Sequence, residues 1–391
     1  METTSMFENF SFHIPTEIFF GPGSLNKMGE ITLPGKRALI VIGGNSVKKH
    51  GYLARLEALL AKQGVSSVIF DGIRPNPVVE DVMKAAEIAK QEHCEFVIGL
   101  GGGSSMDSAK SIAIMATNPG HYWDYIPLGS GKGLPMVNKP LPIVCITTTA
   151  GTGTEADPWT VISKLDTHEK IGFGCKDTFP VISIVDPELM ISVPSQLTAF
   201  QGFDALFHAV EGYIATIASP VSDMLALQSI EYISKYLERA VKDGSDIEAR
   251  SYVALSNTLS GMVESTSCCT SEHSIEHAMS AHSPDLPHGA GLIMISLAYH
   301  EAYAPGCPER YATMARIFGE EASVQGFLSG LKKLQIACGV DQLKMSDYGL
   351  NPDQFGEYAD TARDTMGNLF ELDRQTLSRE AVIKILHKSF R

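Results

Sequence analysis

The sequence predicts an α/β protein in which a parallel-sheet domain precedes a domain made almost entirely of helices. A chain of 391 residues is long for a single hydrophobic core, so two domains are expected. Between about residues 36 and 190, short apolar runs alternate with amphipathic segments, as in strands and helices that build a parallel sheet. After about residue 195, apolar residues recur instead at intervals of three and four, which indicates helices.

The expected elements follow these patterns along the chain. Five apolar runs are predicted strands, at 38–44, 65–72, 95–102, 142–149 and 181–187. Amphipathic segments predict helices at 52–64, 78–93 and 222–244, and 202–213 has the pattern of a buried helix. Two prolines near 190–195 separate the two patterns. We therefore divide the chain into an α/β domain, 1–192, and a helical domain, 193–391.

Composition excludes several classes of partner. With 44% hydrophobic and 19% charged residues, the chain has the make-up of an ordinary globular protein. Its net charge of −14 disfavours binding to nucleic acid or to an anionic membrane surface. No apolar run approaches the roughly 20 residues that cross a bilayer. The N-terminal "METTSMFENFSF" lacks the basic start of a secretory signal, so we expect a cytoplasmic protein.

The seven cysteines predict reduced thiols rather than disulfides or a zinc knuckle. Their number is odd, their spacing is irregular, and they contain no CxxC pair. Adjacent Cys268 and Cys269 either line a site or pack as small buried side chains.

A glycine-rich turn after the third predicted strand indicates a phosphate site. "GLGGGSSMDSAK" places Gly102 and Gly103 before a helix, where backbone can approach a ligand closely. Ser104 is expected at the helix N-cap, with Asp107 three residues on as its capping partner. Free amides at such a helix start attract a pyrophosphate. A purely structural glycine turn remains open, because the run is not GxGxxG.

Two further turns follow predicted strands and so belong at the same sheet edge. "TTTAGTGTE" supplies Thr148, Thr149 and Thr152 after the fourth strand, where open α/β sheets bind nucleotides. "VIGGNSVKKHG" follows the first strand and contains no acid for a ribose 2′-hydroxyl. A 2′-phosphate is therefore tolerated near its tip, which consists of Gly43, Gly44, Asn45 and Ser46, although solvated lysines in a plain turn are the competing interpretation.

The second half contains a pattern typical of metal ligands. Asp204 and His208 stand four residues apart in "GFDALFHAVEGY" and so share one helix face. Burying them unpaired is costly, and a divalent cation removes that cost. Four of the 12 histidines lie between residues 273 and 288. Three imidazoles and a carboxylate suit Fe(II), Zn(II), Co or Ni.

The chain resembles the iron-containing, group III alcohol dehydrogenase family over nearly its whole length. The shared motifs, in order, are "FFGPGSL", "FDGIRPNP", "GGGSSMDSAK", "TTAGTGTE", "GFDALFHAVEGY", "HSIEH" and "PHGAG". The resemblance implies a dinucleotide-binding first domain, a metal-binding and catalytic second domain, and a homodimer or larger homo-oligomer. It also implies an oxidoreductase that transfers hydride between NAD or NADP and a small alcohol or its carbonyl form.

The resemblance implies site residues wherever its motifs match. Asp204, His208, His273 and His288 are the implied metal ligands, and His277 is the implied proton relay. The implied cofactor contacts are Asn76, Gly102, Gly103, Ser104, Asp107, Thr148, Thr149, Thr152 and, on the ribose side, Lys170. Trp159 and Val161 are the implied walls of the substrate pocket.

Two departures from the family pattern affect these expectations. The "GGNS" turn has no aspartate where NAD-specific relatives have one, so the resemblance leans toward NADP without deciding it. His282 is an extra histidine between His277 and His288, and it allows the ligand and relay assignments to be shifted within the cluster. Iron is the implied metal, with Zn(II) as the alternative.

Several other functions are alternatives to the dehydrogenase. A dehydroquinate-synthase-like lyase or a glycerol-dehydrogenase-like enzyme shares the same architecture, but the lyase needs several cations for an acidic substrate, and the segments 200–212 and 265–291 contain no Arg or Lys. A non-enzymatic nucleotide sensor with a structural metal is a second alternative. A metallohydrolase would leave the first domain without a purpose.

Overall fold

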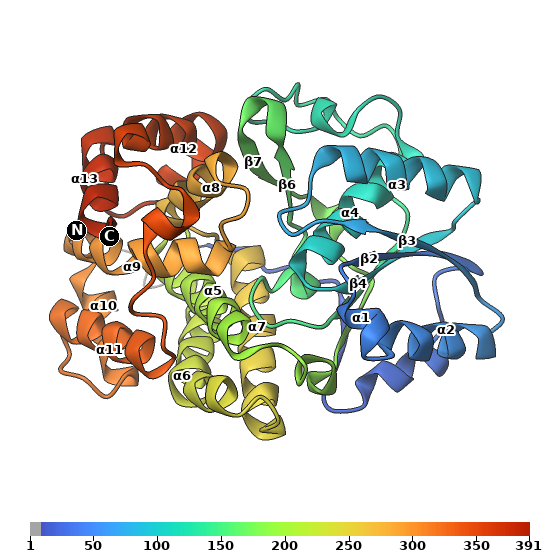
Figure 1. Ribbon diagram of the computed structural model, residues 1–391, viewed down its shortest axis with the longest axis horizontal. Coiled ribbons are helices and arrows are strands. Elements are labelled where there is room, and N and C mark those ends of the chain that lie inside the picture. Colours follow the sequence, from blue (N-terminus) through green and yellow to red (C-terminus); the bar gives the residue numbers. More distant parts are fainter. Residues whose placement is uncertain (1–8) are drawn as a thin grey trace.

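The computed structural model describes residues 9–391, in which a parallel sheet is followed by a set of helices (Figure 1). The predicted fold class is confirmed. Part of the N-terminal segment used to exclude a secretory signal, residues 1–8, lies outside the described residues. Within 9–391, no helix combines the length and apolar character needed to span a bilayer.

Six parallel strands form the main sheet, in the spatial order β1-β8-β5-β4-β2-β3. They are β1 (Glu17–Phe20), β2 (Arg37–Gly43), β3 (Ser66–Ile73), β4 (Phe96–Gly101), β5 (Ile143–Thr147) and β8 (Ile182–Val185). The last five confirm the predicted strands. Strand β1 was not predicted: it has only four residues and lies at the sheet edge, where Glu17 pairs with the distant Ile182.

Helices cover both faces of the sheet, which explains why its strands are continuous apolar runs. Along β2, Leu39 and Val41 face one hydrophobic cluster, whereas Ile40 and Ile42 face another. The first cluster includes α3 (Val79–Gln91) and α4 (Gly103–Thr117), and the second includes α2 (Tyr52–Lys62). A short helix, α1 (Ser46–Lys49), precedes α2.

An antiparallel hairpin between the sheet and the helical half was missed by the sequence patterns. It consists of β6 (Thr160–Lys164) and β7 (Glu169–Phe173). Each strand has five residues, too few for a clear alternation. Strand β7 packs against helices of the second half, and Figure 1 shows the hairpin at the top of the molecule, above the junction of the two halves.

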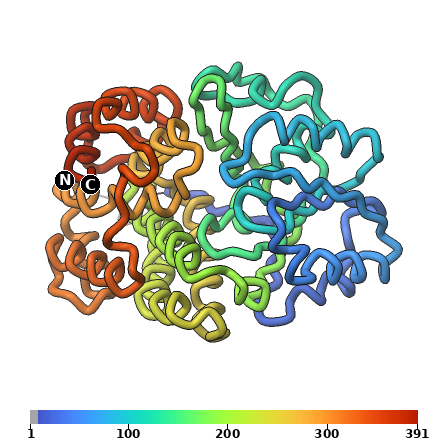
Figure 2. Tube along the Cα trace, viewed as in Figure 1, coloured from blue at the N-terminus to red at the C-terminus, as the bar shows by residue number. Residues whose placement is uncertain are grey.

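The second half is helical, as predicted. Its helices are α5 (Ser195–Ile214), α6 (Pro220–Lys242), α7 (Ile247–Thr266), α8 (Ser271–His282), α9 (His288–Tyr303), α10 (Pro308–Ile317), α11 (Val324–Ala337), α12 (Phe355–Phe370) and α13 (Arg379–Ser389). They share one large hydrophobic core. Figure 2 shows the two halves side by side. The change from sheet to helices falls between β8 and α5, whereas the division into domains at 192/193 stays a prediction.

Backbone contacts hold the two halves together. Gly153 has a φ of +64°, and a Cβ on Gly261 of α7 would lie 2.0 Å from its carbonyl oxygen. The Gly153 amide donates to Asn257 Oδ1 at 2.8 Å. Because both glycines lack a side chain, the loop after β5 lies directly on α7. This contact places the end of the sheet beside the helices that contain the acid and imidazole residues.

Candidate metal centre and cofactor cleft

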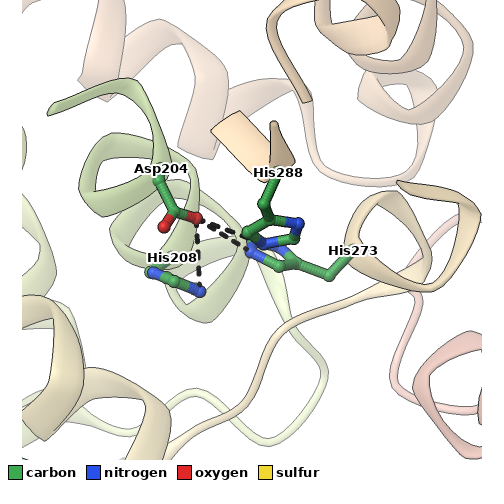
Figure 3. A group of neighbouring side chains, drawn as sticks. All are labelled: Asp204, His208, His273 and His288. Atoms are coloured by element: carbon green, nitrogen blue, oxygen red, sulfur yellow. Dashed lines mark ion pairs between the residues drawn. The ribbon is translucent and has the colours of Figure 1, made fainter. Parts of the chain in front are cut away.

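Four predicted ligands from three helices converge at one point (Figure 3). Helix α5 contributes Asp204 and His208, α8 contributes His273, and His288 is the first residue of α9. The Nε2 atoms of the three histidines lie 3.7, 3.6 and 3.4 Å from Asp204 Oδ1, in the order His208, His273, His288. All four residues are buried except His288, which is partly exposed.

The chemistry of this group fits a divalent cation. Asp204 Oδ1 and His273 Nε2 are buried and lack a hydrogen-bond partner. Leaving such atoms unpaired costs free energy, and a cation between the donor atoms removes this cost. Ligand bonds of about 2.1 Å at tetrahedral angles separate donor atoms by roughly 3.4 Å, which is close to the observed spacings. An all-nitrogen-and-oxygen donor set favours iron or zinc over thiolate-preferring ions.

Buried acids orient two of the three imidazoles, and the sequence patterns did not identify them. His273 Nδ1 pairs with Glu211 Oε1, and His288 Nδ1 pairs with Glu276 Oε2. His208 Nδ1 lies 3.3 Å from the Gly151 carbonyl oxygen. An acceptor at Nδ1 holds the proton there and leaves the Nε2 lone pair free for a metal. Glu211 stands seven residues after Asp204 on α5, a helical spacing that could have revealed it.

The mutual charges of the group shift its pKa values. Burial would raise the pKa of Asp204, but His208 and then His288 lower it to about 2. Burial lowers the pKa of His208 to about 4. At neutral pH the group therefore contains an ionised carboxylate and a neutral His208 imidazole, the forms that bind a metal ion.

His277 lies one turn beyond His273 and beside the four-residue group. Its ring centroid is 5.3 Å from that of His288 and 6.3 Å from that of His273. Burial, followed by the charges of Lys170 and His288, lowers the pKa of His277 well below its ordinary range. His277 is therefore a neutral imidazole at pH 7 and can accept a proton.

His282 is not part of this group. Its Nε2 atom lies 3.0 Å from Thr361 Oγ1, and its ring stacks on His168 at 5.1 Å. The arrangement gives no support to a shift of the assignments toward His282.

The imidazoles described above line a cavity that lies between the two halves of the chain. Residues of the sheet half and of the helices both line it: Asn76, Pro77, Gly103, Ser104, Asp107, Thr152, Thr154, Asp157, Trp159, Val161, Lys170, Gly172, His208, Glu264, Cys268, Cys269, His273, His277, His288, Met366, Asn368 and Leu369. The set includes both predicted substrate-pocket residues and six of the predicted cofactor contacts, namely Asn76, Gly103, Ser104, Asp107, Thr152 and Lys170. Gly102, Thr148 and Thr149 lie just behind this lining.

The two predicted phosphate turns lie against each other. A Cβ on Gly102 would lie 3.0 Å from Thr149 Oγ1, and one on Gly103 would lie 2.5 Å from Thr152 Cγ2. The Thr148 amide donates to the Gly101 carbonyl at 2.9 Å. Glycine is therefore required for the close packing of the two turns, independently of any ligand.

The predicted capping role of Ser104 is wrong. Helix α4 begins at Gly103 with Gly102 as its N-cap, and no side chain caps it. The partner assigned to Ser104, Asp107, instead accepts hydrogen bonds from Thr154 Oγ1 at 2.8 Å and the Val161 amide at 2.9 Å. Burial raises the pKa of Asp107 to about 6. A glycine at the N-cap leaves the side chain of Ser104 free to line the cavity.

Asn76 and Lys170 line the cavity but are already bonded within the chain. Asn76 has a positive φ of 51°, and its amide donates to the Pro284 carbonyl at 2.8 Å. The Lys170 ammonium lies 3.3 Å from Glu276 Oε2 and 3.4 Å from His288 Nδ1. Lys170 thus stands next to the imidazoles, and its predicted ribose contact stays a prediction.

The turn that contains Gly43, Gly44, Asn45 and Ser46 lies outside the cavity lining. It follows β2, which is next to β4 in the sheet, so it shares the sheet edge with the glycine turn. A Cβ on Gly43 would lie 2.6 Å from the Ile73 carbonyl oxygen, which prevents any other residue there without a backbone shift. Lys48 of α1 pairs with Asp71 of β3 beside this turn.

Glu264 of α7 is a cavity residue that the sequence patterns missed. Its Oε1 atom has no hydrogen-bond partner, although the residue exposes only 9% of its surface. Burial, and then the charge of Asp157, raises its pKa well above the ordinary range. It lies nine residues before His273 and outside the motifs shared with the family, so no pattern indicated it.

Comparisons with known proteins agree with this geometry. Residues 15–187 match the family profile described as iron-containing alcohol dehydrogenase, and residues 198–390 match the C-terminal profile of the Fe-containing alcohol dehydrogenase family. Alcohol dehydrogenase 4 of Schizosaccharomyces pombe is 33% identical over 90% of this chain and 83% of its own. The 1,3-propanediol dehydrogenase of Citrobacter freundii is 32% identical over 97% and 99%.

A solved structure has the same fold over the whole chain. The archaeal halo-thermophilic alcohol dehydrogenase from a Red Sea brine pool is 35% identical, with a TM-score of 0.94 over 99% of this chain and 100% of its own. The protein therefore belongs to the iron-containing alcohol dehydrogenase family.

We expect Glu276→Gln to weaken metal binding by about 10- to 100-fold. The amide oxygen can still accept a hydrogen bond from His288 Nδ1, but the neutral side chain no longer offsets the positive charge of Lys170 next to the metal site. Competition with a chelator measures the affinity for Zn(II) or Fe(II). Glu87→Gln, in an exposed ion pair on α3, serves as the control and should change nothing. Equal affinities in all three proteins would contradict an orienting role for Glu276.

Proposed function

We propose that this protein is a metal-dependent, NAD(P)-linked alcohol dehydrogenase that interconverts a small primary or secondary alcohol and its aldehyde or ketone. One observation carries the proposal. Of the four converging side chains, His208, His273 and His288 line a cavity that the glycine turn at Gly103 also lines. A cation site and a phosphate-type turn therefore line the same cavity. Hydride transfer between a dinucleotide and an alcohol held at a metal requires this arrangement.

We assign metal binding to these four side chains, with iron as the first candidate and zinc as the second. A bound cation would supply a Lewis acid for the substrate oxygen, and a bound nicotinamide would supply or accept the hydride. The second domain would then be the metal-binding and catalytic one, and the first the dinucleotide-binding one.

His277 is proposed to hold and move the proton of the reaction. Its low pKa keeps the imidazole neutral at pH 7, so a ring nitrogen has a lone pair to which a proton can pass. Its position beside the ligands, but outside the converging group, separates proton transfer from metal binding. Trp159 and Val161 are proposed to wall the substrate pocket, since both line the cavity.

The dinucleotide is proposed to bind along the sheet edge. Its phosphates would lie at Gly102, Gly103 and Ser104, at the start of α4, where free amides attract anions. Further contacts are assigned to Asn76, Asp107, Thr148, Thr149, Thr152 and Lys170. The adenosine end would lie at the turn with Gly43, Gly44, Asn45 and Ser46. The lack of an acid in this turn and the nearby Lys48 favour NADP over NAD.

We further propose that the protein works in the cytoplasm as a homodimer or a larger homo-oligomer. The cavity between the two halves supports a small-molecule alcohol as the partner.

We expect His277→Ala to retain its metal but lose most of its rate, about 10²- to 10⁴-fold, because the proton relay is gone. His273→Ala should lose the metal as well, because a ligand is removed. Metal analysis after reconstitution with Fe(II) or Zn(II), and reduced-nicotinamide absorbance with butanal, measure both effects. Equal metal retention by the two variants would overturn the assignment, and no turnover by the reconstituted wild type with any aldehyde would refute the function.

We expect Lys48→Ala to lower the ratio of kcat/KM for NADPH over NADH by about tenfold. The change removes a cation and leaves Asp71 unpaired, so both effects disfavour a 2′-phosphate. Steady-state kinetics with the two coenzymes give the ratio, and Lys62→Ala at the far end of α2 is the control. An unchanged ratio would place the 2′-position elsewhere.

A further inference from the structure

The cavity contains one carboxylate whose partner is missing. Glu264 lines the cavity from α7 with its Oε1 atom unbonded, although only 9% of the residue is exposed. The nearest donor to its other oxygen is the weak Sγ–H of Cys269, at 3.9 Å. A buried carboxylate without a strong donor is costly, which indicates that a ligand supplies the missing contact.

The neighbouring histidine does not satisfy this carboxylate. His208 Nδ1 lies 3.4 Å from Glu264 Oε1, but it also lies 3.3 Å from the Gly151 carbonyl oxygen, to which it is hydrogen-bonded. A neutral imidazole with Nε2 free for a metal has only one N–H, on Nδ1. Glu264 therefore stays available to a group inside the cavity.

The cations around the cavity are already paired. The buried Lys110 ammonium donates to Thr154 Oγ1 at 2.6 Å and lies 3.0 Å from Asp157 Oδ1. Lys170 pairs with Glu276. Neither ammonium is bonded to Glu264, and burial raises the pKa of Glu264, so a cationic ligand would both complement this carboxylate and favour its ionised form.

An aromatic side chain lines the same cavity. The indole N–H of Trp159 donates to the backbone carbonyl of Glu264 at 3.3 Å, so the two residues are neighbours, and both line the cavity. Met366 and Leu369 add apolar wall. A carboxylate and an indole in one cavity with apolar walls suit an organic ammonium group, which can gain both an ion pair and a cation–π contact.

We propose that the substrate pocket recognises an alcohol that bears an ammonium group a few carbons from its hydroxyl, with Glu264 as the counter-ion and Trp159 as the aromatic contact. The inference deepens the proposed function and rests on it.

Three isosteric alcohols isolate the charge. 3-Amino-1-propanol, 1,3-propanediol and 1-butanol differ only in an ammonium, a hydroxyl or a methyl group at the end away from the reacting carbon. For the wild type we expect kcat/KM to be at least tenfold higher for the amino alcohol than for 1-butanol at pH 7.5, with the diol between them. A preference for the diol or for 1-butanol would overturn the proposal.

Variants of Glu264 assign the preference to one side chain. Glu264→Gln keeps the shape and should lower the ratio of amino alcohol to 1-butanol at least tenfold, whereas Glu264→Asp keeps the charge and should retain part of it. An unchanged ratio in Glu264→Gln would overturn the proposal. A role limited to supporting His208 would appear as weaker metal binding with the ratio unchanged, and would likewise overturn it.

A binding measurement keeps this test separate from the activity. The chain has two tryptophans, Trp123 and Trp159, so a Trp123→Phe background leaves the fluorescence of Trp159 alone. Titration with propylammonium should give a saturable change that is lost on adding Glu264→Gln and absent with 1-butanol. If no alcohol is oxidised, the proposed function fails, and this titration still decides the inference. No saturable change, or the same change in the Gln variant, contradicts it.

Discussion

The convergence of one carboxylate and three imidazoles at a buried point is the constraint on which the structure of the site depends. Asp204 lies within 3.4 to 3.7 Å of three Nε2 atoms, and its Oδ1 atom has no hydrogen bond. Without a cation, the folded state bears the cost of burying these groups unpaired. Metal binding and the packing of α5, α8 and α9 are therefore linked, because a cation stabilises only the arrangement in which the three helices meet.

The surrounding residues support the proposal of a reaction site rather than a structural metal site. Glu211 and Glu276 fix the proton positions of two imidazoles, and His277 remains outside the converging group with a neutral ring. The close contact between Gly153 and Gly261 places the sheet edge beside the helices. As a result, the start of α4 and the imidazoles line the same cavity, and the two halves of the chain depend on each other for function.

The sequence predicted those parts of the fold that leave a repeating pattern. Buried parallel strands are continuous apolar runs, so β2, β3, β4, β5 and β8 were found. The edge strand β1 and the hairpin β6–β7 are short, and their pairing depends on distant residues, so local patterns could not indicate them. Ser104 was misplaced because a serine followed by an acid resembles a cap, whereas Asp107 bonds to the hairpin start instead.

The candidate site was predictable where its residues repeat at helical spacing or match family motifs. Asp204, His208, His273 and His288 were found in this way. Glu276 and Glu264 were not, because an acid within a helix usually faces solvent, and only the folded chain shows that these two are buried. The acids paired with the candidate ligands and the buried Glu264 in the cavity are properties of tertiary packing.

The position of the metal tests the central claim most directly. Crystals of protein reconstituted anaerobically with Fe(II), measured at the iron absorption edge, give an anomalous difference map that locates the ion. If these four side chains bind the metal, we expect one strong peak between Asp204 Oδ1 and the Nε2 atoms of His208, His273 and His288. A peak elsewhere, or fully reconstituted protein with these side chains bonded only to one another, would contradict it.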